Sequence, residues 1–155
     1  MEVVQLTYIE EEFEFRQNNS SYGEILEHLR SMDYSHLNGV KSLAELDIYA
    51  KKLATNSERF EYWKSSELIG ILCFYINTEK KLIFITNISI DENYRGNGLA
   101  KKLILELIDR YQKDLKYAIT LNVGGNNLKA LSLYKKMGFS LEEKVGSRFN
   151  LKKTK

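Results

Sequence analysis

The segment at residues 95–101 has the composition of an anion-binding loop. Arg95-Gly96-Asn97-Gly98-Leu99-Ala100-Lys101 is expected to follow a strand and to open a helix. Its two glycines let the backbone curl tightly and let a bulky anion approach. The N–H groups of a first helical turn favour phosphate or pyrophosphate, and Arg95 and Lys101 would add charge at the rim. The alternative is a plain tight turn before a helix.

The glycine spacing separates this loop from two common nucleotide-binding motifs. A Walker loop needs Gly-Lys-Ser/Thr at its end, but Leu99 and Ala100 follow Gly98. The dinucleotide pattern Gly-x-Gly-x-x-Gly fails at its third glycine, where Lys101 stands. A nicotinamide-dependent oxidoreductase is therefore an alternative that the sequence disfavours.

The elements around this loop predict a mixed α/β fold. Capping boxes start two helices, one at Ser21 with Glu24 and one at Ser42 with Glu45. The second helix would bury the stripe Leu43, Leu46, Ala50 and Leu53. Alternating or apolar runs predict strands at 3–8, 60–64, 68–76, 81–90, 118–123, 139–144 and 148–152.

The order of these elements predicts their pairing. The strands at 60–64, 68–76 and 81–90 should form an antiparallel meander. A helix from Gly98 to about Lys113 should then connect 81–90 to a parallel strand at 118–123 by a right-handed crossover. A short helix at 127–137, ended by Gly138 in the left-handed conformation, should precede a closing hairpin. The sheet is thus expected to be mostly antiparallel, with one parallel strand-helix-strand unit.

Two motifs together carry a family resemblance. Arg95, Gly98 and Ala100 form Arg-x-x-Gly-x-Ala after a strand, which is similar to the pyrophosphate loop of the acetyl-CoA-dependent GNAT N-acetyltransferases. The second motif, Asn-x-x-Ala-x-x-Leu-Tyr-x-x-x-Gly-Phe, resembles that family's later signature and runs from Asn127 to Phe139. The resemblance covers roughly residues 82–139 and implies a GNAT acyl-CoA N-acyltransferase-like fold, with acetyl-CoA as co-substrate.

The resemblance also implies roles for individual residues. Ile88, Ser89 and Ile90 would pair their backbone with the pantetheine arm, and an N–H near Ile88 would stabilise the oxyanion. Residues 96–101 would hold the pyrophosphate, and Asn127 would bind near the pantetheine arm. Tyr134 would protonate the departing thiolate. A phenol, with pKa near ~10, can protonate a thiolate whose conjugate acid has a pKa near ~8.5.

A general base is not identified by the sequence. Some family members carry a carboxylate on the strand before the pyrophosphate loop, whereas 81–90 has no acidic residue and holds Phe84 and Asn87 instead. Asp33, His36 and Glu61 are the candidates from other segments. The missing carboxylate keeps open a second function, an inactive acetyl-CoA-binding sensor or interaction domain. Tyr134 argues against that alternative.

The composition limits the possible binding partners and the cellular compartment of the protein. A chain of 155 residues with net charge +2 fits one domain over 1–155. Its spread basic residues give no nucleic-acid footprint, and its longest apolar run, 68–76, is too short to span a bilayer. Cys73 is the single cysteine, which fits a reducing cytosol. We expect a cytoplasmic enzyme with a small-molecule amine acceptor, without metal, nucleic acid or membrane, and a homodimer as an open possibility.

Overall fold

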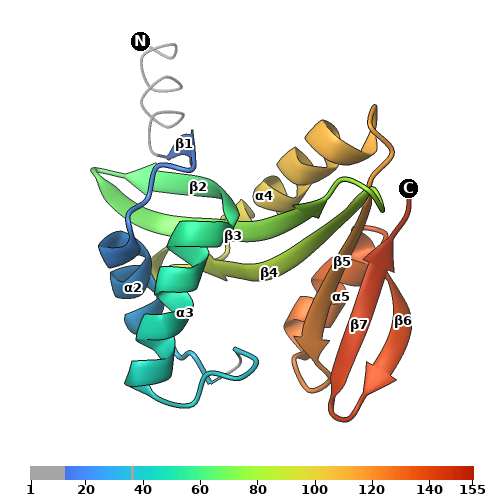
Figure 1. Cartoon of the computed structure of the whole chain (residues 1–155). Helices are drawn as coiled ribbons and strands as arrows, with labels where there is room; N and C mark the ends of the chain where they lie inside the picture. Colours follow the sequence, from blue (N-terminus) through green and yellow to red (C-terminus); the bar gives the residue numbers. More distant parts are fainter. Residues whose placement is uncertain (1–12, 36) are drawn as a thin grey trace.

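A mixed sheet organises the chain in the computed structural model, which describes residues 13–35 and 37–155 (Figure 1). Within these residues the sheet has seven strands in the order β1-β2-β3-β4-β5-β7-β6. The strands are β1 (Glu14–Gln17), β2 (Glu58–Lys64), β3 (Glu67–Asn77), β4 (Leu82–Ile90), β5 (Ala118–Gly124), β6 (Ser140–Val145) and β7 (Arg148–Lys153). The helices are α2 (Tyr22–Arg30), α3 (Leu43–Asn56), α4 (Leu99–Leu107) and α5 (Leu128–Lys136).

The strand pairing follows the expected plan. β2, β3 and β4 form the antiparallel meander, and β4 pairs with β5 in parallel after the α4 connection. All other pairs are antiparallel, so the expected fold class is confirmed. The strand expected at residues 3–8 lies outside the described residues. The short β1, which pairs with β2, was not expected from the sequence.

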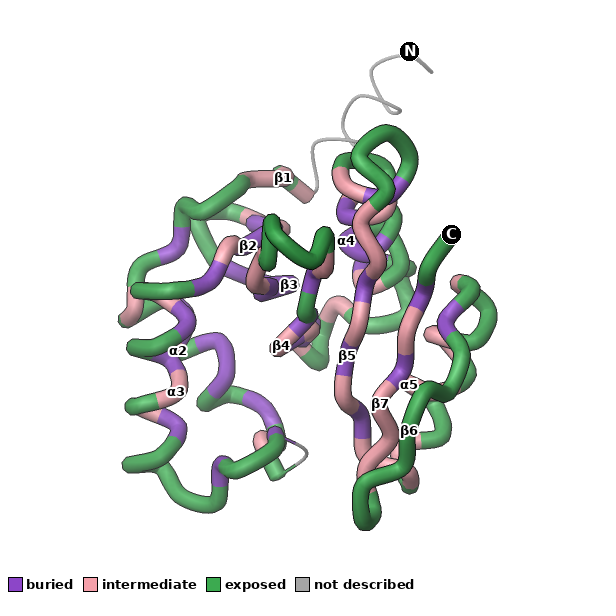
Figure 2. The backbone as a smooth tube through the Cα atoms, turned by 45° about the vertical axis from the view of Figure 1, so that its right-hand side comes forward, coloured by how far each residue is buried: buried purple, intermediate pink, exposed green. Residues whose placement is uncertain are grey.

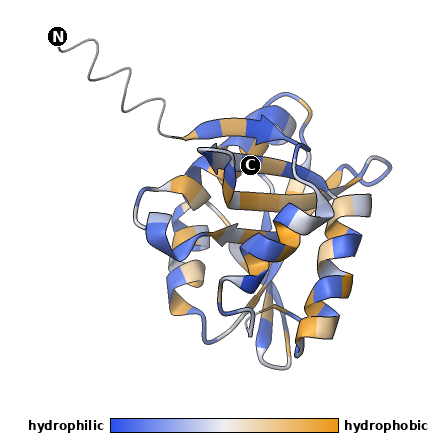
Figure 3. Ribbon diagram, turned by 90° about the vertical axis from the view of Figure 1, so that its left-hand side faces the viewer, coloured by the Kyte–Doolittle hydropathy of each residue, from blue (hydrophilic) through white to orange (hydrophobic). Residues whose placement is uncertain are grey.

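The helix caps explain why the helices start where they do. The Ser21 hydroxyl accepts from the Glu24 N–H while the Glu24 side chain accepts from the Ser21 N–H, a complete capping box for α2. The Ser42 hydroxyl likewise accepts from the Glu45 N–H, but the Glu45 carboxylate accepts from the Lys41 N–H, so the capping box expected at Ser42 is only half formed. Hydrophobic and hydrophilic residues alternate along the helices, as they must when one side is buried (Figure 3).

The helix expected from Gly98 to about Lys113 has nearly that extent, with an α-helical part over Leu99–Leu107 and a π-helical segment over Ile108–Gln112. One expected feature of α3 is corrected. Leu43, expected in the buried stripe of α3, is the first residue of that helix and is 54% exposed. The rest of that stripe, Leu46, Ala50 and Leu53, is buried.

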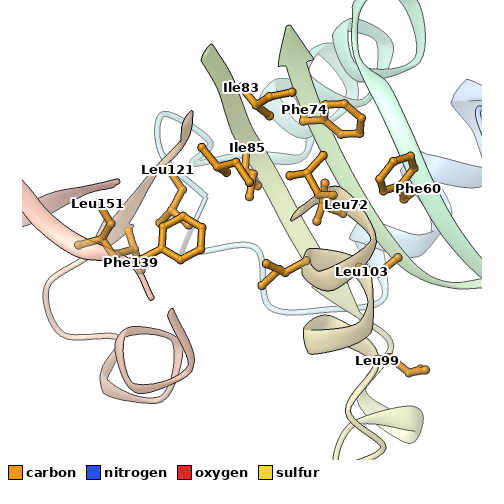
Figure 4. Packing of buried hydrophobic residues seen from close by; sticks show 14 of the residues in the cluster. Phe60, Leu72, Phe74, Ile83, Ile85, Leu99, Leu103, Leu121, Phe139 and Leu151 are labelled. Carbon is orange, nitrogen blue, oxygen red and sulfur yellow. The ribbon is translucent and has the colours of Figure 1, made fainter. Parts of the chain in front are cut away.

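The sheet is covered on both faces by separate hydrophobic clusters. α2 and α3 pack against one face through a cluster that includes Ile25, Leu46, Ile71 and Cys73. α4 and α5 cover the other face, where Leu103 and Phe139 meet core residues of β2–β5 and β7 (Figure 4). β3 is therefore buried along most of its length, as its continuous apolar run predicts. The edge strand β6 is exposed throughout (Figure 2).

No helix within residues 13–35 and 37–155 has the length and apolar character to cross a membrane.

Candidate active site

A cleft opens where β4 and β5 separate. The two strands pair only from Leu82 with Ala118 to Ile85 with Leu121, although β4 continues to Ile90 and β5 to Gly124. The cleft has a volume of about 590 Å³. Its walls include Thr86, Asn87 and Ile88 of β4, Asn122, Val123 and Gly124 of β5, Tyr49 and Lys52 of α3, Tyr134 of α5, and Arg148 of β7.

A β-bulge in β4 lies at the start of the separation. Cys73 pairs with Asn87 and Phe74 pairs with Ile85, so Thr86 is an extra residue without a partner on β3. A bulge bends the strand and increases its local twist. From α3, the Tyr49 hydroxyl donates to the Thr86 carbonyl oxygen at 3.0 Å. The bulge and this contact both lie where β4 stops pairing with β5.

Tyr134 lies on α5 and lines the cleft. Its ring packs edge-to-face against Phe139, with ring centroids 5.8 Å apart. Burial raises the pKa of Tyr134 to about 12. Its hydroxyl has no hydrogen-bond partner within the described part of the chain, and the raised pKa keeps this cleft-lining phenol protonated and able to donate.

The other residues expected at the cofactor are divided between the cleft and its surroundings. Ile88 and Asn127 line the cleft. The Asn127 side-chain oxygen accepts from the Ala130 N–H, so Asn127 is also the N-cap of α5. Ser89 and Ile90 are buried at the same end of β4, which pairs with β3 but not with β5.

The glycine loop forms an open helix N-terminus. Gly96 and Gly98 have φ of 85° and 72°, and a Cβ on either would meet nothing within 4 Å. The first α4 hydrogen bond runs from the Lys102 N–H to the Gly98 carbonyl, which leaves the amides of Leu99, Ala100 and Lys101 without intrahelical acceptors. These amides suit a phosphate group.

The remaining side chains of this loop fix its shape. Arg95 donates from Nε to the Ile90 carbonyl oxygen at 3.0 Å, which ties the loop to the end of β4. Asn97 Nδ2 donates to the Tyr94 carbonyl at 2.9 Å. The Leu99 side chain is 2% exposed and anchors α4 in the core, while Lys101 is exposed at the helix start. The Arg95 contact was not indicated by the sequence, which placed that side chain at the rim.

The three candidate bases differ in their surroundings. The Glu61 carboxylate is fully buried, 3.5 Å from Arg59 Nε, and accepts from the Ser20 N–H and from Trp63 Nε1. It is thus part of a structural network under β1 and does not line the cleft. Asp33 accepts from the Ser35 N–H in the loop between α2 and α3. His36 lies outside the described residues.

Two residues at the site, His28 and Arg148, were not selected from the sequence. His28 of α2 is buried and contacts Ser89, which in turn contacts Asn87 on the cleft wall. Arg148 lies on the opposite wall, where its Nε donates to the Asn122 side-chain oxygen. No sequence motif marks these residues, because their association depends on the packing of α2 and β7 against the two separated strands. Among the described residues, no group of acidic, His and Cys side chains could hold a metal.

Comparisons with known proteins agree with this geometry. A family model described as "Acetyltransferase (GNAT) family" matches residues 23–139. An uncharacterized N-acetyltransferase of Bacillus subtilis, YvbK, is 29% identical over 85 residues, which are 55% of this chain and 54% of that protein. The chain thus spans about half the length of this curated relative.

Solved structures share the fold over most of the chain. The PaiA N-acetyltransferase of Thermoplasma acidophilum, solved in complex with coenzyme A, has a TM-score of 0.73 and 19% identity, over 92% of this chain and 99% of that one. A chimera of the spermidine N-acetyltransferase SpeG of Vibrio cholerae with hSSAT has a TM-score of 0.68 and 22% identity, over 92% of this chain and 95% of that one. At these identities the likeness shows the fold.

Proposed function

The chain belongs to the acetyltransferase (GNAT) family, and on that premise we propose that it transfers the acetyl group of acetyl-CoA to the primary amine of a small molecule. The observation that carries the proposal is the position of Tyr134. Its protonated phenol lines the cleft where β4 and β5 part, and its hydroxyl has no other partner among the described residues. A donor so placed suits a reaction that releases a thiolate.

The chain's own groups fit acetyl-CoA at two places. The amides at the start of α4 and the open space above Gly96 and Gly98 suit the pyrophosphate. Beyond Ile85, the backbone groups of β4 that face β5 have no strand partner within residues 13–35 and 37–155, so an extended arm can bind there as an added strand. In the proposal Ile88, Ser89 and Ile90 supply these groups, and Asn127 lies near the same arm.

The reaction needs no covalent enzyme intermediate. The amine attacks the thioester carbonyl directly, the Ile88 N–H stabilises the oxyanion, and Tyr134 gives its proton to the thiolate. Both reactants are held in one cleft, so positioning supplies a large part of the rate. Asp33 and His36 stay candidates for taking the amine's proton, whereas the buried network around Glu61 makes that carboxylate an unsuitable one.

The test combines binding with turnover. Acetyl-CoA should raise the melting temperature, whereas NADH and ATP should not. The protein should also release thiol from acetyl-CoA in the presence of primary amines. Tyr134→Phe should keep the acetyl-CoA shift and lose roughly 100-fold or more in kcat, because it removes the acid alone. Tyr111→Phe is the matched control, since Tyr111 also packs edge-to-face in an aromatic pair but does not line the cleft.

The outcomes separate the candidate functions. An acetyl-CoA shift without turnover of any amine would favour the binding module over the enzyme. A Tyr134→Phe variant as active as the unchanged protein would remove the acid role. A melting temperature insensitive to acetyl-CoA at millimolar concentration would refute both functions, and a shift with NADH alone would favour the oxidoreductase.

A further inference from the structure

Three buried polar side chains form a chain of hydrogen bonds from α2 to the cleft. His28 Nδ1 lies 3.1 Å from the Leu68 carbonyl oxygen, and His28 Nε2 lies 3.0 Å from Ser89 Oγ. Asn87 Nδ2 lies 3.1 Å from the same Ser89 Oγ. His28, Ser89 and Asn87 are only 4%, 7% and 4% exposed. Among them, Asn87 lines the cleft.

The chemistry of these groups fixes the direction of every hydrogen bond in the chain. A carbonyl oxygen can only accept a hydrogen bond, so His28 Nδ1 must be protonated and must donate to the Leu68 carbonyl oxygen. Burial lowers the pKa of His28, so the ring is neutral and Nε2 accepts the Ser89 hydroxyl proton. Ser89 has then used its single proton and can only accept from Asn87. The Asn87 amide must therefore turn its NH₂ group toward Ser89.

The end of this chain is an unsatisfied acceptor. Asn87 Oδ1 is buried and has no hydrogen-bond partner within the described residues. Buried polar atoms in folded proteins nearly always have a partner, and one that lacks it at a ligand cleft points to a ligand group. The group that would satisfy Asn87 Oδ1 must be a hydrogen-bond donor.

We propose that Asn87 Oδ1 accepts a hydrogen bond from the amine of the acceptor, and that Ser89 and His28 are positioning residues that fix this orientation. The proposal rests on the acetyltransferase function. Asn87 lies next to the bulged Thr86, on the face of β4 that α2 and α3 cover, because its partner Ser89 contacts α2. An amide is too weak a base to take the amine's proton, so Asn87 orients the nitrogen while another group or water deprotonates it.

A double-mutant cycle tests the relay. Asn87→Ala and Ser89→Ala should each lower kcat/KM for the amine about ten-fold, the loss of one hydrogen bond, while acetyl-CoA still raises the melting temperature. The double variant should be no worse than Asn87→Ala alone, because Ser89 acts only through Asn87. Ser57→Ala is the control, since it deletes another buried hydroxyl, which donates to the Leu53 carbonyl away from the cleft. Additive losses, or an unaffected Ser89→Ala, would overturn the relay.

A second measurement needs neither substrate. In ¹⁵N-histidine NMR spectra at neutral pH, His28 should appear as the neutral Nδ1–H tautomer, with the His36→Gln variant used to assign it. An Nε2–H tautomer or an imidazolium would overturn the proposal even if the enzyme is active. Loss of the acetyl-CoA shift in the unchanged protein, with the predicted tautomer present, would instead count against the proposed function.

A different observation bears on the class of acceptor. Lys52 of α3 and Arg148 of β7 face the cleft from opposite walls, and no Asp or Glu is among its described lining residues. Arg148 is half-buried and is held by Asn122, which donates to Asn150 Oδ1 at 2.7 Å. Neither Lys52 nor Arg148 forms an ion pair with a carboxylate of the described residues.

We infer that the acceptor carries an anionic group, a carboxylate or a phosphate, in addition to its amine. Two cations in a cleft without a described carboxylate attract an anion and repel a second ammonium group. Arg148 offers a planar guanidinium, which matches carboxylate and phosphate oxygens. This inference also rests on the proposed function, and it disfavours a polyamine acceptor.

Matched amines test the inference directly. β-Alanine, propylamine and 1,3-diaminopropane present the same primary amine with a carboxylate, a methyl group or a second ammonium at the far end. O-Phosphoethanolamine against ethanolamine separates phosphate from carboxylate recognition. We expect the anionic amines to be acetylated with the highest kcat/KM, and Arg148→Gln to reduce their advantage roughly ten-fold. Lys144→Gln, which removes an exposed cation of β6 that does not line the cleft, should not.

The contrary results are distinct. Preference for 1,3-diaminopropane or propylamine would overturn the anionic acceptor and leave the acetyltransferase intact. Failure to acetylate any of the five amines, with the acetyl-CoA shift preserved, would also overturn it. If acetyl-CoA does not raise the melting temperature, the proposed function on which this inference rests is refuted.

Discussion

The hydroxyl of Tyr49 on α3 donates to the carbonyl oxygen of Thr86, the bulged residue of β4, at 3.0 Å. This contact joins the helix layer to the point where the sheet divides. Tyr49→Phe should leave the fold intact, lower the free energy of unfolding by about 1 kcal/mol and reduce kcat/KM several-fold, because the bulge loses its tether. Thermal unfolding and thiol-release kinetics measure both effects.

Tyr75→Phe provides the comparison for that variant. Tyr75 is a half-buried tyrosine of the neighbouring strand β3 that does not line the cleft. An equal loss of activity in both variants would show that the Tyr49 contact has no particular role.

The raised pKa of Tyr134 predicts the alkaline side of the pH profile. A general acid works only while it is protonated, and a phenol with a pKa of about 12 stays protonated well above pH 10. An alkylamine nucleophile has a pKa near ~10.4 and becomes more reactive as it loses its proton. Hence kcat/KM should rise from pH 7 to about 10 without a descending limb. A decline that begins below pH 10 and disappears in Tyr134→Phe would contradict the pKa shift.

Gly98 should be needed for acetyl-CoA binding. Its φ of 72° is left-handed, and its missing Cβ leaves open the space above the α4 amides. Gly98→Val should abolish the rise in melting temperature that acetyl-CoA causes at about 100 times its dissociation constant, which corresponds to roughly 2.7 kcal/mol. Gly146→Val carries a similar backbone penalty, at φ of 60°, in the distant β6–β7 turn. If it abolishes the shift equally, the effect is one of stability.

We expect Glu61 to stabilise the fold and to take no part in the reaction. Its buried carboxylate pairs with Arg59 and accepts backbone N–H groups of Asn19 and Ser20. Glu61→Gln leaves the Arg59 charge buried without its counter-ion, which should cost about 3–5 kcal/mol of unfolding free energy. At temperatures where the variant is folded, kcat should be unchanged. A selective loss of kcat with normal thermal stability would restore Glu61 as a candidate base.

The sequence predicted the parts of the molecule whose signals are local. The Ser21 capping box, the strands β2–β5 and the left-handed Gly138 depend on neighbours within a few residues, and each has the expected conformation. Tyr134 and Asn127 were chosen through a motif, and both line the cleft.

The features that the sequence did not predict depend on distant contacts. The bulge at Thr86 lies where β4 keeps its pairing with β3 but stops pairing with β5, so it depends on strands that are distant in the sequence. The relay to Asn87 requires His28, which is 59 positions away and has no motif of its own. β1 is four residues long and too short to show periodicity.

The short β4–β5 ladder connects two parts of the sheet, one made of β1–β4 and the other of β5, β7 and β6. Four residue pairs, Leu82–Ile85 with Ala118–Leu121, are the backbone ladder that joins β1–β4 to β5, β7 and β6. A ligand arm that forms hydrogen bonds with β4 in the gap would link these two parts of the sheet beyond the short ladder. Amides of β4 beyond Ile85 should then exchange hydrogen more slowly in the ligand-bound protein, as occupancy stiffens the whole sheet.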